Sequence, residues 1–376
     1  MNQFRLFVNK KYAIELGNYQ DLYNWSVNEI NHFWEAVWSF GNPVASKEYQ
    51  HVVDDDSKMP GAKWFSGARL NFAENLLRRR DNHTAILSRG EGKEDRQISY
   101  IELYSEVEKM AAALRDAGVK QSDRVAGFLP NIPEAVIAML GAASLGAVWS
   151  SSSPDFGIKG VLDRFRQIEP KVLLAADGYQ YNGKRINSLD KLKEILTELP
   201  SVEKVVVVPF ESENPDLSGI NKGVLYGEFL PAEAPSLEFV QLPFDHPLYI
   251  MYSSGTTGLP KSIVHGAGGT LLQHMKELRL HGDINDKETV FYFTTCGWMM
   301  WNWLVSNLAL GATIVLYDGS PFHPDSSAMW QMAEEFGITV FGTSAKFIAA
   351  CQGYGLVPKD RHDLSLIKTI LSTGSP

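Results

Sequence analysis

Short apolar segments alternate with longer amphipathic segments from Thr84 onward, and this alternation limits the possible folds more than any other feature of the sequence. Segments 124–129 and 171–175 have the length and composition of buried strands, whereas 102–117 and 189–199 have the spacing of helices. Strands that alternate with helices are joined by crossover connections, which make a parallel sheet with helices on its faces. We therefore predict an α/β fold of mostly parallel, doubly wound sheets with flanking helices.

Changes in composition predict two boundaries along the chain. Residues 1–80 are rich in Trp, Asn and charged side chains, which is typical of a helical and irregular extension, whereas residues 81–376 carry the alternating segments. Residues 211–245 are rich in proline and acidic side chains, which predicts an irregular connection. We expect this connection to separate two subdomains, roughly 81–245 and 246–376.

The extension contains one amphipathic helix with a clear starting signal. Ser26 and Glu29 match a capping box, in which each residue satisfies a backbone N–H of the other. The apolar residues that follow, to Phe40, recur every three or four positions. We therefore predict a helix that begins near Ser26 and buries an aromatic face.

The stretch 252–265, YSSGTTGLPKSIVH, has a composition suited to holding a polyphosphate. It joins a predicted strand at 247–252 to another at 262–265. Glycines let the backbone approach an anion closely, hydroxyls donate hydrogen bonds, and the lysine adds a positive charge. The phosphate-binding candidates in this loop are Ser253, Ser254, Gly255, Thr256, Thr257, Gly258 and Lys261.

Two other interpretations of this loop remain open. The first is the loop G-x-x-x-x-G-K-[ST] of phosphoryl-transfer proteins. Pro260 stands where the second glycine of that pattern belongs, and proline has no N–H to donate. A β-branched, apolar segment then follows Lys261, whereas the phosphoryl-transfer loop opens directly into a helix. The second interpretation is a surface turn rich in Ser and Gly, in which the lysine and the paired hydroxyls would be incidental.

The loop resembles the signature of the acyl-adenylate-forming superfamily, which includes acyl-CoA synthetases, luciferases and the adenylation domains of peptide synthetases. The resemblance implies that the loop holds the β- and γ-phosphates of ATP. It implies catalytic roles for Thr256, Thr257 and Lys261, and nucleotide contacts for the other Ser and Gly residues of the loop. Segment 64–77, WFSGARLNFAENLL, is similar to the W-F-x-G-x-x-L-N segment of acetyl-CoA synthetases.

A second segment, TTCGWMMWNW at 294–303, follows a predicted strand and precedes a predicted helix. Open α/β sheets bind ligands at such strand ends, although this composition is also typical of a packed aromatic core. In acyl-CoA synthetases the corresponding segment lines the acyl pocket. The resemblance therefore implies that the acid is contacted by Trp298, Met299, Met300 and Trp301. Side chains of this size leave room only for a short acid.

The end of the chain, ILSTGSP at 370–376, resembles the strand that ends in G-E-P in acetyl-CoA synthetases, where it contacts adenine and closes the acyl pocket. This resemblance implies nucleotide contacts for Gly374, Ser375 and Pro376, and a substrate contact for Thr373. Ser375 replaces the glutamate, which makes the ending more similar to the acetoacetyl-CoA synthetase branch. A plain strand end is the alternative.

Segment 177–185, DGYQYNGKR, aligns by position with a part of acetyl-CoA synthetases that approaches coenzyme A. Tyr181, Lys184 and Arg185 are therefore candidates for contacts with the phosphates of coenzyme A. Tyr181 stands where that family often carries Arg, and a solvated loop is the competing interpretation. Cys296, in the aromatic segment, is interpreted as a small buried side chain rather than a reactive thiol.

Charge and cysteine content exclude several classes of function. A formal charge of −9 argues against a general surface for nucleic acid or anionic membranes, which needs clustered Lys and Arg. The two cysteines, Cys296 and Cys351, form no C-x-x-C pair, so neither a disulfide framework nor a cysteine-rich zinc site is expected, and no metal ligands are assigned. We expect a cytoplasmic protein whose partners are small molecules, with no nucleic acid and no membrane.

The resemblance covers the whole chain and implies an AMP-forming ligase that joins a short acid, expected to be acetoacetate, to coenzyme A through an acyl-AMP intermediate. ATP, Mg²⁺ and coenzyme A are the implied cofactors. Acetate and propionate are alternative acids, and a phosphotransferase or a non-catalytic module are alternatives from other classes. Because the chain stops after a crossover strand without its helix, we expect residues 81–376 to be an incomplete large adenylation domain. The C-terminal lid domain would be absent and the fragment alone inactive.

Overall fold

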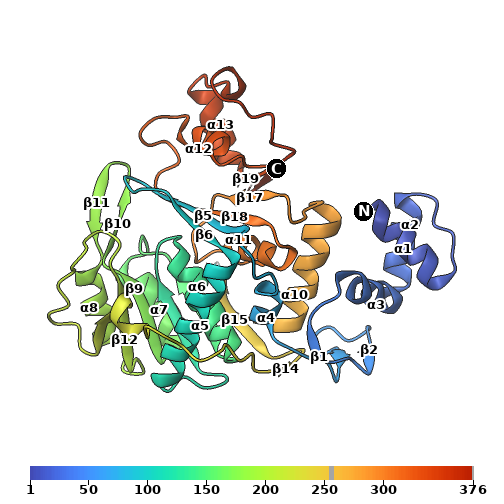
Figure 1. Ribbon diagram of the computed structural model, residues 1–376, viewed down its shortest axis with the longest axis horizontal. Coiled ribbons are helices and arrows are strands. Elements are labelled where there is room, and N and C mark those ends of the chain that lie inside the picture. Colours follow the sequence, from blue (N-terminus) through green and yellow to red (C-terminus); the bar gives the residue numbers. More distant parts are fainter. Residues whose placement is uncertain (254–257, 375–376) are drawn as a thin grey trace.

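The computed structural model describes residues 1–253 and 258–374, and it has the predicted α/β architecture with mostly parallel sheets (Figure 1). Two large sheets form its body. The first has the strand order β13 (Gly223–Leu225), β12 (Lys204–Val208), β9 (Val172–Ala176), β7 (Arg124–Phe128), β8 (Val148–Ser152), β15 (Pro247–Ser253) and β16 (Lys261–Gly266). The second has the order β20 (Thr369–Thr373), β19 (Val340–Ser344), β17 (Thr289–Tyr292), β18 (Thr313–Asp318), β5 (Thr84–Gly90) and β6 (Arg96–Ser99).

Most neighbouring strands in both sheets run parallel, as crossover connections require. Antiparallel pairs stand at one edge of each sheet. β15 pairs with β16 at the edge of the first sheet, and β5 pairs with β6 at the edge of the second. The β15–β16 pair carries the loop that the sequence singles out.

Alternating side chains along the strands divide the body into layers. In β9, Val172 and Leu174 belong to one hydrophobic core, whereas Leu173 and Ala175 belong to another. Successive side chains of a strand point to opposite faces, so a strand that is apolar at every position must be covered on both faces. In the second sheet, β18 is divided in the same way between the central core and a third core.

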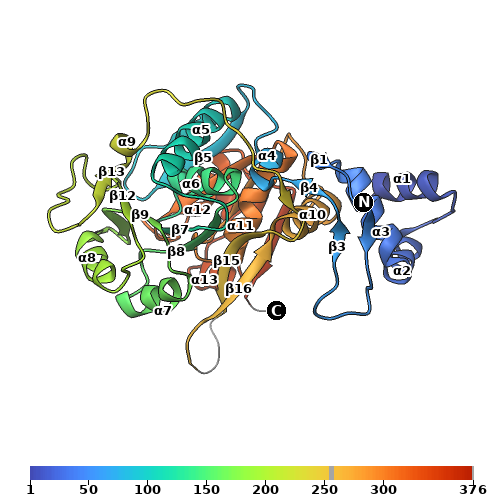
Figure 2. The same ribbon diagram turned by 90° about the horizontal axis from the view of Figure 1, so that it is seen from below.

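Helices fill the space between the sheets and cover their outer faces (Figures 1 and 2). The outer face of the first sheet packs against α7 (Ile158–Ile168) and α8 (Leu189–Thr197), and that of the second against α12 (Ala328–Glu335) and α13 (Ala345–Gly353). None of the described helices is both long enough and apolar enough to cross a membrane. The central layer contains α4 (Phe72–Leu76), α5 (Tyr100–Asp116), α6 (Pro133–Ser144), α10 (Ala267–Lys276) and α11 (Met299–Val305).

Three helices at the start of the chain form a cluster at one side of the molecule (Figure 1). They are α1 (Asn2–Tyr12), α2 (Tyr19–Asn28) and α3 (Ile30–Gly41). Their aromatic and aliphatic side chains surround a small core of their own, which includes Phe4 and also Leu280 from beyond α10. The aromatic face expected from the sequence is therefore buried between helices.

The predicted helix start at Ser26 is wrong. The capping box lies earlier, where the Asn18 side chain accepts from the N–H of Asp21 and the Asp21 carboxylate accepts from the N–H of Asn18. Ser26 lies inside α2, and its hydroxyl donates to the carbonyl of Tyr23 at 2.8 Å. The helical run breaks at Glu29 instead, between α2 and α3. Two capping patterns compete within twelve residues, and the earlier one starts the helix.

Short elements also occur where the sequence indicated only irregular chain. Residues 211–245 contain β13, α9 (Tyr226–Phe229) and β14 (Leu242–Pro243). Small antiparallel sheets join β14 to β4 (Arg69–Leu70) and β1 (Ala45–Lys47), and join β2 (His51–Val53) to β3 (Trp64–Ser66). A hairpin of β10 (Gly178–Tyr181) and β11 (Lys184–Asn187) follows β9.

The two sheets do not divide at the predicted subdomain boundary near residue 245. β5 and β6 precede that boundary and pair within the second sheet, whereas β15 and β16 follow it and pair within the first. The division of the chain at residue 80 and near residue 245 stays a prediction, and the strand pairing does not follow the second of these boundaries.

Candidate active site

The glycine-rich loop joins two strands that are directly paired at its base. Ser253, the last residue of β15, is the partner of Lys261, the first residue of β16. Lys261 is exposed, and Gly258 has a φ of 92°, which favours glycine. Figure 2 shows the paired strands β15 and β16 projecting from the body of the molecule. The candidates Ser254, Gly255, Thr256 and Thr257 lie outside the described residues.

Helix α7 contacts both strands at the base of the loop. The guanidinium of Arg164 lies 5.7 Å from the ring centre of Tyr252 in β15. The side chain of Gln167 donates to the carbonyl of Pro260 at 2.8 Å and accepts from the hydroxyl of Ser262 at 2.9 Å. These contacts fix the backbone on either side of Lys261.

Buried hydroxyls support the same base from within the first sheet. The hydroxyls of Ser150 and Tyr252 lie 3.1 Å apart, and Ser150 donates to the carbonyl of Ile250 at 2.9 Å. Burial raises the pKa of Tyr252 to about 12, so its phenol stays protonated near neutral pH. Further along the same strand pair, the ring of His265 lies 5.1 Å from the ring of its strand partner Tyr249 in a tilted arrangement, and burial lowers the pKa of that histidine. His265 therefore has the contacts of a neutral structural residue.

The aromatic segment begins with a turn that lies against the first sheet. The Cys296 thiol donates to the carbonyl of Leu129 at 2.9 Å, and the Cys296 carbonyl accepts from the hydroxyl of Ser151 at 2.6 Å. Burial raises the pKa of Cys296 to about 12, which leaves the thiol protonated and unreactive. Gly297 continues along the end of β8, with the position of its absent Cβ 3.5 Å from the Cα of Ser152.

The four substrate candidates of this segment divide into a surface group and a buried residue. Trp298 and Met299 are 57% and 47% exposed, and Met300 is half-buried. Trp301 is 0% exposed, and its indole N–H donates to the side-chain oxygen of Asn131 at 2.9 Å. The first three lie where a ligand can reach them. A role in the acyl pocket stays a prediction for Trp301, whose observed contacts are those of a core residue.

The last strand places another candidate at the carboxyl end of the second sheet. Thr373 is exposed and pairs with Ser344 of β19. Gly374 has a φ of 96°, a conformation that favours glycine. Ser375 and Pro376 lie outside the described residues, so their predicted nucleotide contacts stay predictions.

The candidates for coenzyme A lie on the hairpin of β10 and β11. Tyr181 is 49% exposed, Lys184 is exposed, and Arg185 reaches Glu211 only at 3.7 Å. The turn of the hairpin has positive φ at Asn182 and Gly183, as two-residue hairpin loops require. The hairpin is thus an ordered, solvated projection on which all three candidate side chains are exposed, with Arg185 also paired to Glu211.

Comparison with known proteins places these segments within the match to one protein family. The family described as "AMP-binding enzyme" matches residues 72–376, and a second family, "Acetyl-coenzyme A synthetase N-terminus", matches residues 19–76. The chain belongs to the AMP-binding enzyme family. The family match includes the glycine-rich loop, the aromatic segment and the last strand, which are the segments that the sequence had singled out.

Individual relatives cover this chain from end to end. The acetoacetyl-CoA synthetases of Gallus gallus and Rhizobium meliloti (strain 1021) are 50% and 47% identical to it over 100% of its length. The malonamoyl-CoA synthetase vrtB of Penicillium aethiopicum is 43% identical over 98% of this chain and 55% of its own length. The structure of acetoacetyl-CoA synthetase from Streptomyces lividans superimposes with a TM-score of 0.94 at 44% identity. The chain spans 58% of that structure and 58% of the Gallus gallus and Rhizobium meliloti relatives.

Sequence reasoning missed two side chains that hold the site segments of this AMP-binding enzyme. Gln167 supports the base of the loop, and Asn131 anchors Trp301. Neither residue was among the candidates predicted from the sequence, and nothing about Gln167 distinguishes it from other exposed helical residues. Neither residue belongs to a recognisable motif, because their partners lie far away along the chain.

A partly buried carboxyl group, that of Asp318, also lies close to Asn131. The Asp318 carboxylate at the end of β18 accepts from the backbone N–H of Asn131 at 3.3 Å. Burial raises the pKa of Asp318 to about 7, an effect that the N–H of Asn131 opposes and the nearby carboxylates of Asp155 and Glu91 reinforce. Among the described residues, no group of three or more His, Cys, Asp and Glu side chains is arranged to hold a metal ion.

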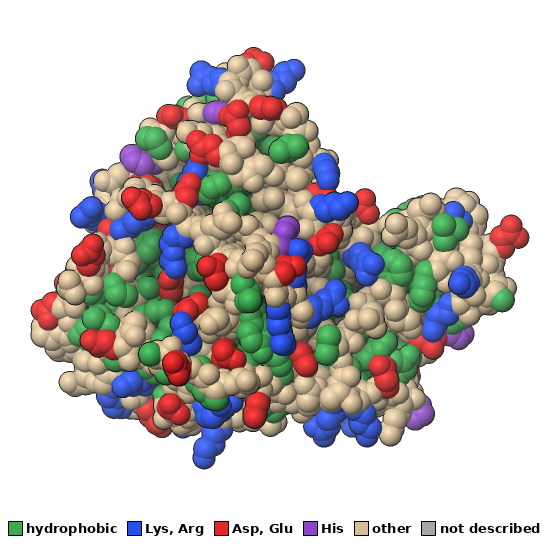
Figure 3. All heavy atoms as spheres, viewed as in Figure 1, with side chains coloured by type: hydrophobic (Ala, Val, Ile, Leu, Met, Phe, Trp, Pro, Cys, Tyr) green, Lys and Arg blue, Asp and Glu red, His purple; other side chains and the backbone are tan. Residues whose placement is uncertain are grey.

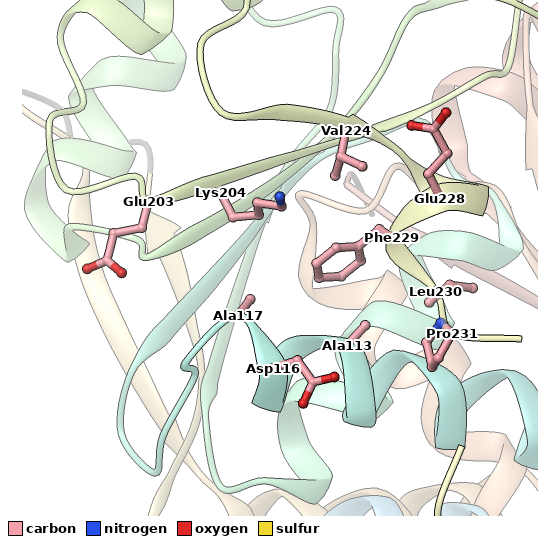
Figure 4. Close-up of a pocket in the computed structure, with 10 residues that line it drawn as sticks. All are labelled: Ala113, Asp116, Ala117, Glu203, Lys204, Val224, Glu228, Phe229, Leu230 and Pro231. Atoms are coloured by element: carbon pink, nitrogen blue, oxygen red, sulfur yellow. The ribbon is translucent and has the colours of Figure 1, made fainter. Parts of the chain in front are cut away.

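One hollow of the described surface lies away from these segments. A hollow of about 460 Å³ between the end of α5, β12 and α9 is drawn in Figure 4. Its lining combines apolar side chains, Phe229 among them, with Asp116, Glu203, Lys204 and Glu228, and it includes none of the predicted site residues. On the face shown in Figure 3, the described acidic and basic side chains are interspersed rather than gathered by sign.

Proposed function

We propose that the full-length protein containing this chain is an AMP-forming ligase that joins acetoacetate to coenzyme A at the expense of ATP. The likeness of the whole chain to relatives named acetoacetyl-CoA synthetase, at 47% and 50% identity, is the observation that carries this proposal. The TM-score of 0.94 to the Streptomyces lividans enzyme supports it. A reducing cytoplasm is the proposed setting, since Cys296 and Cys351 are both free and buried.

The names of the relatives support a substrate class as well as one acid. The relative that is 43% identical is named for malonamoyl-CoA, which makes malonamate a second candidate acid. Acetoacetate and malonamate are both short carboxylates with a carbonyl group on the third carbon. They differ only in whether a methyl or an amino group lies beyond that carbonyl. Acetate, propionate and butyrate lack the third-carbon carbonyl and are therefore informative comparison acids.

In the proposed first step, a carboxylate oxygen attacks the α-phosphorus of ATP, the bond to the bridging oxygen breaks, and pyrophosphate leaves. Lys261 carries an exposed positive charge at the base of the loop, and it would stabilise the charge that develops on the leaving pyrophosphate. No proton transfer is needed for this step. The loop residues Ser253 and Gly258 would border the phosphates together with the residues between them.

In the proposed second step, the thiol sulfur of coenzyme A attacks the acyl carbon, AMP leaves, and the thiol proton passes to water. Lys184 and Arg185 on the exposed hairpin would attract the phosphates of coenzyme A. Trp298, Met299, Met300 and Thr373 would border the acid. Mg²⁺ is expected to accompany ATP, but the described residues contain no cluster suited to it, and no step of the proposal runs through the metal.

The test is ATP–pyrophosphate exchange by the full-length protein with acetoacetate, malonamate, butyrate and acetate, followed by identification of the nucleotide product. We expect exchange that depends on the acid, fastest with acetoacetate, and AMP as the product when coenzyme A is added. ADP as the product would instead indicate a phosphotransferase. Absence of ATP binding would indicate a non-catalytic module, and either result would overturn the proposal.

A further inference from the structure

Buried hydrogen bonds tie the aromatic segment of the second sheet to the ends of strands in the first. The segment leaves β17 at the carboxyl end of the second sheet and enters α11 at Met299. Along this path it is held by the Leu129 carbonyl and the Ser151 hydroxyl, which both bond Cys296, and by the side chain of Asn131. All three residues belong to β7, β8 or the turn that follows β7.

Asn131 is the only one of these three whose side chain bonds the segment at two residues, Thr294 and Trp301. Its side-chain oxygen accepts from the indole N–H of Trp301 at 2.9 Å. Its side-chain nitrogen donates to the carbonyl of Thr294 at 3.2 Å and to the carbonyl of Tyr317 at 3.4 Å. Asn131 is 1% exposed, and both polar atoms of its side chain are bonded. Asp offers no donor in its ionised form, so the amide is the short group that matches this set of partners.

Two residues between these two anchors are accessible. Thr294 and Trp301 bracket the segment, whereas Trp298 and Met299 between them are 57% and 47% exposed. A buried side chain that fixes both ends of a short segment determines where the side chains in its middle stand. Cys296 adds a third fixed point, through Leu129 and Ser151.

We propose that Asn131 is a positioning residue that sets the acyl-binding side of the site and thereby its preference for a short acid with a carbonyl on the third carbon. This inference rests on the proposed function for the identity of the acid. Asn131 acts through Trp301 and Thr294, and through them it places Trp298 and Met299. Gln167 and Lys261, at the base of the loop, are held by other elements, so the ATP side of the site is independent of Asn131.

The test compares Asn131→Ala with Trp301→Phe in the full-length protein. Trp301→Phe keeps an aromatic ring in the core and removes the indole N–H. We expect Asn131→Ala to raise KM for acetoacetate at least tenfold while KM for ATP stays within twofold. Its preference for acetoacetate over butyrate should fall at least fivefold. Trp301→Phe should change the same constants in the same direction, and adding Asn131→Ala to it should have less effect than in the wild-type background.

Asn71→Ala is the matched control for a loss of stability alone. Asn71 is 0% exposed, and its side-chain nitrogen donates to the carbonyls of Ala143, Ser144 and Val240, away from the aromatic segment. It should lower Tm as Asn131→Ala does, yet leave both KM values and the acid preference unchanged. If Asn131→Ala behaves like Asn71→Ala, the inference is overturned and Asn131 is only structural.

Two further measurements keep the result interpretable. If Asn131→Ala does not fold, Trp301→Phe alone decides, and an unchanged KM for acetoacetate in that variant overturns the inference. Hydrogen exchange of the backbone at 294–301 should quicken in Asn131→Ala while exchange in β15 and β16 stays the same, and uniform quickening would contradict a local positioning role. If the wild-type protein shows no ATP–pyrophosphate exchange that depends on the acid, the proposed function is overturned. This outcome is distinct from one in which the wild type is active and only the inference about Asn131 fails.

Discussion

The hydroxyl of Ser262 donates to the side-chain carbonyl of Gln167 at 2.9 Å, and through this bond helix α7 holds the strand that presents Lys261. The same glutamine donates to the carbonyl of Pro260, so its amide bonds the chain on both sides of the lysine. Glycine-rich loops have few apolar contacts of their own, and their position depends on what fixes their ends. Under the proposed function, Gln167 is therefore predicted to influence ATP binding without contacting ATP.

Replacing Gln167 by Ala should weaken ATP binding slightly and specifically. Exposed hydrogen bonds contribute about 0.5–1 kcal/mol each, so KM for ATP should rise about two- to fivefold with little change in KM for the acid. Steady-state kinetics of the full-length protein measure both constants. Gln331→Ala is the control, because Gln331 is also an exposed helical glutamine and bonds only Glu335 of its own helix. If the two substitutions have equal effects on KM for ATP, Gln167 has no specific role in holding the loop.

Lys261→Ala should lower the rate of ATP–pyrophosphate exchange by about a hundredfold, since a charge directed at a leaving group is worth several kcal/mol in a shielded site. Lys261→Arg should recover part of that rate because it keeps the charge but changes the geometry. Lys359→Ala, which removes an exposed lysine far along the chain, should leave the rate unchanged. A Lys261→Ala enzyme that exchanges at the wild-type rate would show that the lysine does not face the phosphates.

Coenzyme A binding should depend on the hairpin of β10 and β11. Charged contacts to phosphate are worth about 1.5–3 kcal/mol, so Lys184→Ala combined with Arg185→Ala should raise KM for coenzyme A at least tenfold. Acid-dependent ATP–pyrophosphate exchange, which needs no coenzyme A, is the internal control and should be unaffected. The hairpin should stay folded, because Glu91 holds its turn through the N–H groups of Asn182 and Gly183. An unchanged KM would favour the solvated-loop interpretation.

Local sequence patterns predicted the elements of this fold better than the contacts between them. Four consecutive residues of the segment 171–175 are apolar, from Val172 to Ala175, and a strand of that kind has few alternatives to burial between two layers. The helix start at Ser26 was wrong because a second capping pattern, at Asn18 and Asp21, lies just upstream. The hairpin at 178–187 was missed because it is short and polar, and such strands are indistinguishable from loops by periodicity.

The candidate site shows the same limit. Its loop is visible in the sequence because all its chemistry lies within ten residues. Asn131 is not visible, since its side-chain partners Thr294, Tyr317 and Trp301 lie 163, 186 and 170 positions further along the chain. Only the pairing of the strands brings them together. The burial of Trp301 agrees with the packed aromatic core that the composition of its segment also allowed, whereas the resemblance pointed to a pocket wall.

The stability of the domain should depend on pH through His274. This histidine is buried, bonds Ser306 at 2.8 Å, and burial lowers its pKa from 6.5 to about 4. Between these two values the unfolded chain binds a proton that the folded chain does not, so stability falls as pH falls through that window. The full difference corresponds to about 3 kcal/mol. Urea unfolding at pH 7 and pH 4 measures it.

His274→Gln should remove most of that histidine's share of the pH dependence, because Gln can still bond Ser306 but does not titrate. His32→Gln is the control, as His32 lies on the exposed side of α3. If the free energy of unfolding depends on pH as strongly in the His274→Gln variant as in the wild type, the effect belongs to other groups.

Residues 1–376 alone should catalyse neither acyl-AMP nor acyl-CoA formation at a useful rate. The chain spans 58% of its Streptomyces lividans counterpart, and the edge of its second sheet is open, with Ile370 of β20 53% exposed. Water at an open site weakens each electrostatic contact that should act on the transition state.

Weak ATP binding should survive, because Lys261 and the rest of the loop lie within the chain. Isothermal titration with ATP and pyrophosphate exchange with acetoacetate measure the two properties separately. If residues 1–376 catalyse ATP–pyrophosphate exchange at the rate of the full-length protein, this part suffices for adenylation. The prediction that adenylation needs the rest of the full-length protein would then be wrong.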